Sequence, residues 1–170
     1  KVKELVLEIP MANGKLEKFK VFESPVMQPG ISARYPMIKT YKAYQVNNKS
    51  TQIRFSVSPN GFHAAIHEAD GEKYIDPYSN KNLDDYIVYD VKDDQPELYK
   101  GVDMCGVTDE GRPSKGQFMP NLRSAGEVEM RIYKVAMACT GSWGAKRGTK
   151  VACLADMNTM LNRMNLMYEK

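Results

Sequence analysis

The sequence lacks several features that would assign it to a broad class of protein. Its 170 residues contain no apolar run near the ~20 residues that a membrane-spanning helix needs. Its 24 basic and 21 acidic residues give a net charge of +3, and no dense Lys/Arg run occurs. We therefore expect no nucleic acid and no membrane among its partners. Hydrophobic residues make up 42% of the chain, enough for one globular core.

Cysteine is also scarce, with three residues in the chain. An odd number permits at most one disulfide and leaves at least one thiol free. Cys139 ends an apolar segment and Cys153 begins an expected helix, so the two are either a disulfide or a pair of buried thiols. Cys105 lies in a polar stretch that contains glycine, which is an unusual environment for a core residue.

The first ninety residues have the pattern of an antiparallel β-sheet or sandwich. Alternating apolar residues and turn signals every eight to twelve residues predict strands at 3–9, 16–22, 38–46, 51–58, 62–68, 73–76 and 86–90. Asn13-Gly14 is a strong hairpin signal between the first two. In the fourth strand, Ile53, Phe55 and Val57 are expected to point into the core.

The composition changes after this sheet. Residues 91–127 are rich in charged residues, Gly and Pro, and they predict an extended segment. Residues 130–139 become continuously apolar, which predicts a strand, and a loop is expected over 141–148. A helix then follows, with Thr149 as N-cap. Its apolar residues recur at three- and four-residue steps: Leu154, Met157, Leu161, Met164 and Tyr168.

The predicted fold class is therefore α+β, with three parts. Residues 1–90 form a β-rich core, residues 91–127 form a linker, and residues 128–170 form a strand–loop–helix unit. Such a unit cannot bury both its faces alone, so it is expected to begin a further domain.

Four patterns resemble binding sites but have simpler explanations. His63 and His67 have the spacing of a zinc-binding helix, yet they fall in an expected strand, where residues four apart lie ~13 Å apart. We expect His63 to be structural and His67 exposed. Residues 141–148 lack the phosphate-loop glycine patterns, and the helix methionines are expected to fill a core. Four acidic residues lack the spacing of a calcium-binding loop and are expected to lie in solvated loops: Asp84, Asp85, Asp93 and Asp94.

Residues 104–108 read MCGVT and resemble the cysteine-switch motif of adamalysin/reprolysin-type zinc metallopeptidase zymogens. That motif is usually written PKMCGVT, and here Val102 and Asp103 replace the Pro-Lys lead. The segment GKLEKFKVFESPVM from Gly14 resembles the prodomains of secreted bacterial members. The most specific matches are Ser24-Pro25, the IDPY of 75–78 and the NRMN of 162–165.

The resemblance extends over nearly the whole chain, but the catalytic HExxHxxGxxH signature is absent. Residues 133–141 and 157–169 look like the first strand and first long helix of the family's catalytic domain. The resemblance therefore implies a propeptide followed by the N-terminal βα unit of the enzyme, 128–170. As given, the chain is not expected to be an enzyme, whereas its parent would be a secreted or cell-surface zinc endopeptidase.

The resemblance also assigns roles to individual residues. Cys105 is the expected inhibitory ligand to the catalytic zinc, held in a loop with Met104, Gly106 and Val107. The partners implied are the chain's own catalytic domain, which holds the zinc, and an activating protease. The cleavage points offered are Arg112, Lys115 and Arg123. If the helix lacks its partner domain, its exposed apolar face favours a homodimer.

Two other functions remain open from the residues. The chain could be a stand-alone β-rich binding or adhesion domain, in which the final strand and helix close its own core. It could also be an enzyme with Cys105 as nucleophile, which needs His63 or His67 beside the thiol.

Overall fold

The computed structural model describes residues 5–93 and 133–168. Of these, residues 5–93 and 137–168 belong to one compact unit. The elements, in chain order, are β1 (Leu5–Pro10), β2 (Leu16–Glu23), α1 (Pro29–Arg34), β3 (Lys39–Gln45), β4 (Gln52–Ser58), β5 (Gly61–Glu68), β6 (Gly71–Ser79), β7 (Asn82–Asp90), the 3₁₀ turn η1 (Val91–Asp93), α2 (Gly141–Arg147) and α3 (Lys150–Tyr168).

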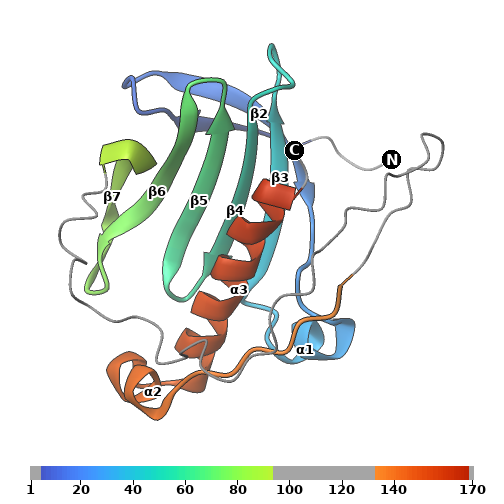
Figure 1. Ribbon diagram of the computed structural model, residues 1–170, viewed down its shortest axis with the longest axis vertical. Helices are drawn as coiled ribbons and strands as arrows, with labels where there is room; N and C mark the ends of the chain where they lie inside the picture. The colour runs from blue at the N-terminus through green and yellow to red at the C-terminus, as the bar shows by residue number, and fades with distance from the viewer. Residues whose placement is uncertain (1–4, 94–132, 169–170) are drawn as a thin grey trace, which may run out of the picture. The chain divides into compact units, whose positions relative to one another are not determined.

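The seven strands form one antiparallel sheet in which every strand pairs with its neighbour in the sequence. The sheet curls into a half-barrel, and α3 packs across one of its faces (Figure 1). The α+β class predicted from the sequence is confirmed. None of the helices in the described residues is long and apolar enough to span a membrane.

The hairpin between β1 and β2 turns where the sequence predicts it. Gly14 has a φ of +76°, a conformation that glycine adopts without steric cost. The Asn13 side chain accepts a hydrogen bond from the Lys15 backbone N–H at 2.9 Å. The turn sets the register in which Leu7 faces Phe19.

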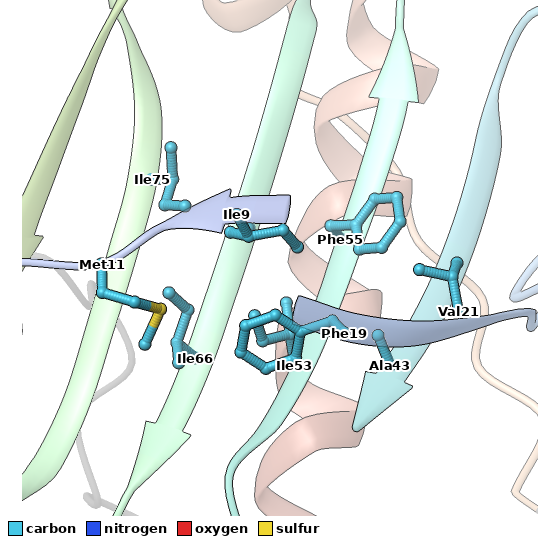
Figure 2. Packing of buried hydrophobic residues seen from close by; sticks show 10 residues of the cluster. Ile9, Met11, Phe19, Val21, Ala43, Ile53, Phe55, Ile66 and Ile75 are labelled. Atoms are coloured by element: carbon cyan, nitrogen blue, oxygen red, sulfur yellow. The ribbon is translucent and has the colours of Figure 1, made fainter. Parts of the chain in front are cut away.

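The hydrophobic core lies on the inner face of the curl. Figure 2 shows Ile9 of β1 and Met11, which follows β1, lying across the side chains of Ile66 and Ile75 from β5 and β6. The curl therefore brings the first strand over the strands that follow much later in the chain. The buried members of the hydrophobic core are Ile9, Met11, Phe19, Val21, Ala43, Ile53, Phe55, Ala64, Ile66 and Ile75.

Strand β4 has two buried faces because both sides of the sheet are covered. Ile53 and Phe55 enter the core, while Arg54 and Ser56 point to the opposite face and bond to α3. Val57, predicted to point inward, is exposed, since the core stops at Phe55 and the strand ends one residue after Val57.

Two expectations for the segment before α3 are wrong. The strand predicted over 130–139 is absent from its described part, where residues 133–139 are exposed and have no strand to pair with. The loop predicted over 141–148 is mostly the helix α2. Thr140 caps α2 by accepting a hydrogen bond from the Trp143 N–H, and Gly148 ends it with a φ of +75°.

Helix α3 begins as predicted but presents the opposite face to the sheet. Thr149 accepts a hydrogen bond from the Ala152 N–H at 3.1 Å, which confirms it as the cap. The face against the sheet is largely polar, so the expectation of an inward apolar stripe is wrong. Met164 and Tyr168 of that stripe are exposed. The buried residues of α3 are Cys153, Ala155, Asn158, Thr159, Asn162 and Leu166.

Candidate functional site

The residues that the resemblance assigns to zinc ligation and cleavage lie outside the described residues. Zinc ligation by Cys105 and cleavage of the linker therefore stay predictions. The residues concerned are Met104, Cys105, Gly106, Val107, Arg112, Lys115 and Arg123.

The other two cysteines are described, and both thiols are free. Cys153 is buried in α3, whereas Cys139 is exposed, so neither a disulfide nor a pair of buried thiols is present. Burial, together with a hydrogen bond to the Cys139 thiol, raises the pKa of the Cys153 thiol. The two sulfur atoms are thus neighbours although they are not bonded.

The site that the structure adds is a set of polar side chains between the sheet and α3, which we call the polar layer. Side chains of both sheet and helix meet there directly. Its members are Arg54, Ser56 and Asp76 from the sheet, Asn60 from the turn between β4 and β5, and Asp156, Thr159, Asn162 and Arg163 from α3.

Asn162 is at the centre of the polar layer and is 1% exposed. Its Oδ1 accepts a hydrogen bond from Arg54 Nη1 at 3.0 Å, and its Nδ2 donates to the Phe55 carbonyl at 2.9 Å. Arg54 is also buried, and Nη1 donates to Ser24 Oγ at 3.3 Å. One side chain of α3 therefore satisfies two buried polar groups of β4, which would be costly to leave unpaired.

The polar layer continues toward the start of α3. The hydroxyls of Ser56 and Thr159 lie 2.7 Å apart. Asn60 Nδ2 donates to Asp156 Oδ1 at 2.7 Å and to the Ala152 carbonyl at 2.9 Å. Asp156 also pairs with Arg147 of α2, at 2.5 and 2.8 Å. The N-terminal half of α3 is thus tied to both the sheet and α2.

At strand β6, the Asp76 carboxylate has three hydrogen-bond partners. Oδ1 lies 2.5 Å from both His63 Nδ1 and Arg163 Nη2, and Oδ2 accepts a hydrogen bond from the Tyr89 hydroxyl at 2.9 Å. Burial alone would raise the pKa of Asp76, but the His63 hydrogen bond and the Arg163 charge hold it below its ordinary value. The guanidinium of Arg163 also lies over the Tyr74 ring.

A groove of about 380 Å³ runs beside the polar layer, between α3 and the sheet. Its lining includes Trp143 of α2, the methionines 160, 164 and 167 and Arg163 of α3, and Tyr74 of the sheet. The methionines, predicted to fill a core, are exposed instead. We call this the methionine groove.

The histidines lie in strand β5, as the sequence indicated. His63 has the structural role predicted, since Nδ1 faces Asp76 and Nε2 lies 3.3 Å from the Asn60 carbonyl. His67, predicted to be exposed, is half-buried. Within the described residues no group of three His, Cys, Asp or Glu side chains could hold a metal ion.

The described acidic residues that were expected in loops lie in regular elements instead, so that expectation is wrong for them. Asp84 and Asp85 are exposed on strand β7, and Asp93 is in η1. Asp94 lies outside the described residues.

Sequence reasoning missed the polar layer because buried helix positions are usually apolar. Two signals were available. Asn158 and Asn162 are four residues apart and share one face of the helix. Arg54 and Ser56 alternate with the core residues Ile53 and Phe55, so they needed polar partners on the other face of the sheet.

No protein-family model, curated protein or solved structure matches the chain. The likeness to reprolysin-type zymogens therefore rests on the residues quoted from the sequence.

Proposed function

We propose that the chain is the propeptide region of a zinc metallopeptidase zymogen, joined to the start of the enzyme. The sheet of residues 5–90 is the prodomain in this proposal, and α3 is the first long helix of the catalytic domain. Cys105 keeps the enzyme latent by binding the catalytic zinc, which the catalytic domain holds, and the prodomain covers the cleft. The resemblance also implies that the prodomain assists folding of the enzyme.

The observation that carries the proposal is that the most specific segments of the resemblance lie close together in the structure. Arg54 donates one hydrogen bond to the Ser24 hydroxyl and another to the Asn162 side chain. Next to them, Asp76 pairs with Arg163. The segments 24–25, 75–78 and 162–165 are far apart in the sequence, yet the last two contribute side chains to the polar layer and Ser24 bonds to one of its members, Arg54. Such convergence is expected if these segments are kept for a contact between prodomain and enzyme.

The distribution of apolar and polar contacts also suits a prodomain that must leave. The hydrophobic core is built from residues of the sheet region, with its buried members between 9 and 75, so the sheet can stay folded without α3. The contact with α3 is rich in hydrogen bonds and ion pairs, as in interfaces between domains that separate. Cutting the linker would then release two parts rather than unfold one.

The chemistry proposed for Cys105 is direct coordination. In a zinc peptidase the metal supplies an activated water in its open coordination position. The Cys105 thiolate would occupy that position, and metal binding removes its proton. Because the cysteine is tethered, its effective concentration is in the ~mM range until the linker is cut.

Inhibition in trans tests the proposal. The purified chain is added to a zinc-loaded catalytic domain of the reprolysin type, and peptide hydrolysis is measured. We expect wild-type chain to inhibit and Cys105→Ala to inhibit at least tenfold less. Cys139→Ala is the matched control, since it removes an exposed thiol elsewhere. Equal inhibition by Cys105→Ala and wild type would contradict zinc coordination by Cys105.

The alternative is a stand-alone β-rich binding or adhesion domain. The observation that favours it is that α3 and the sheet form one compact unit. Limited proteolysis of the linker separates the two functions. A prodomain should lose residues 133–170 on gel filtration at low concentration, whereas a stand-alone domain should retain them.

A further inference from the structure

Helix α3 carries an apolar surface that nothing in the described residues covers. Met160, Met164 and Met167 are 55%, 41% and 50% exposed, Tyr168 is 81% exposed and Trp143 of α2 is 40% exposed. The three methionines are spaced four and three residues apart, so they form one ridge along the helix. We call these five residues the methionine face. An exposed apolar patch of this kind marks an interaction surface.

We propose that the methionine face binds a second copy of this chain, with the two α3 helices antiparallel across a twofold axis. The ridge of each helix would lie in the methionine groove of its partner. This association is separate from the zinc chemistry and does not depend on Cys105.

Shape supports a second copy, because each chain carries both halves of the contact. The ridge of methionines runs alongside the groove of about 380 Å³, which the same methionines and Trp143 line. A twofold interface needs such a self-complementary surface. Methionine side chains are flexible enough to fill an irregular groove.

Charge selects the antiparallel arrangement. Within the described residues, α3 has no acidic residue in its first turn and no basic residue in its last turn. Lys150 begins α3, and Lys146 lies in the last turn of α2, which precedes it. The C-terminal end of α3 carries the negative end of the helix dipole, and an antiparallel partner would bring its lysines toward that end. A parallel pair would instead place the lysines of both copies together.

The area of the methionine face predicts a weak dimer. The side chains of Tyr168 and Trp143, at ~200 Å² each, are 81% and 40% exposed and together offer about 240 Å² of accessible surface. The three half-exposed methionines offer a comparable area, so two copies would bury roughly 1,000 Å² in total, below the ~1,200 Å² of stable complexes. We expect a dissociation constant in the micromolar range.

Sedimentation equilibrium under reducing conditions tests the dimer. We expect the apparent mass of wild-type chain to rise from one copy to two between about 1 and 100 μM. The double variant Met160→Glu/Met164→Glu should associate at least tenfold more weakly. Met37→Glu is the control, because Met37 is similarly exposed and lies outside the methionine face. Circular dichroism checks that each variant is folded.

Two results would overturn the proposal. One is a wild-type chain that stays monomeric at 100 μM, which would assign the surface to a different partner. The other is a folded double variant that dimerises as tightly as wild type. The orientation has its own test, since Lys150→Glu should weaken the dimer several-fold at low salt and less at high salt. No effect of Lys150→Glu at low salt would refute the antiparallel arrangement. Cys105→Ala should dimerise like wild type whatever its effect on inhibition.

Discussion

Replacing Asn162 by alanine should detach α3 from the sheet more effectively than any change on its outer face. Asn162 makes one hydrogen bond with the buried Arg54 and one with the Phe55 carbonyl. A hydrogen bond to a charged group contributes about 1.5–3 kcal/mol, and a neutral one about 1 kcal/mol. The variant should therefore lower the free energy of unfolding by about 2–4 kcal/mol.

Urea unfolding followed by two signals measures this effect. Trp143, the single tryptophan, lies in α2 beside α3, and far-UV circular dichroism follows the whole chain. Because the sheet has its own core, we expect the Trp143 transition of Asn162→Ala to move to lower urea than the transition of the sheet. Met160→Ala, on the exposed face of the same helix, should cost less than about 1 kcal/mol at low protein concentration. Equal losses for the two variants would refute the view that polar contacts hold α3.

Three further substitutions test other parts of the fold. Phe19→Ala empties the middle of the core and should cost about 3–5 kcal/mol in urea unfolding, and a cost below 1 kcal/mol would contradict the core. Gly61→Ala should cost more than about 1 kcal/mol, because the φ of Gly61 is +101° and a Cβ would lie 2.8 Å from Pro77; an unchanged midpoint would refute this. The folded pKa of Asp76 lies below its ordinary value of 3.8, so its charge stabilises the fold above about pH 4, and this stabilisation is lost as pH falls through the folded pKa. Asp76→Asn should therefore be less stable than wild type at pH 7, with a difference that shrinks toward pH 2, and a pH-independent difference would contradict the assignment.

The strands were predictable because their signal is local. Alternation of apolar residues and turn residues such as Asn13-Gly14 are properties of neighbouring positions, and all seven strands occur close to where the sequence indicates them. The curl was not predictable. It depends on the contact of Ile9 and Met11 with strands more than forty residues later, which no local pattern encodes.

The orientation of α3 was predicted wrongly for a physical reason. An apolar stripe on a helix normally faces the core, yet the face of the sheet that meets α3 offers Arg54, Ser56 and Asp76. Those groups need polar partners when buried, so Asn162 and Arg163 face the sheet and the methionines face outward. Satisfying buried polar groups decided the orientation over hydrophobic periodicity.

The most direct measurement of the central claim is X-ray absorption at the zinc edge, on the complex between this chain and a zinc-loaded reprolysin-type catalytic domain. With wild-type chain we expect one sulfur neighbour at about 2.3 Å from the zinc, and its loss in Cys105→Ser. A zinc bound by nitrogen and oxygen alone in the wild-type complex would contradict latency by Cys105.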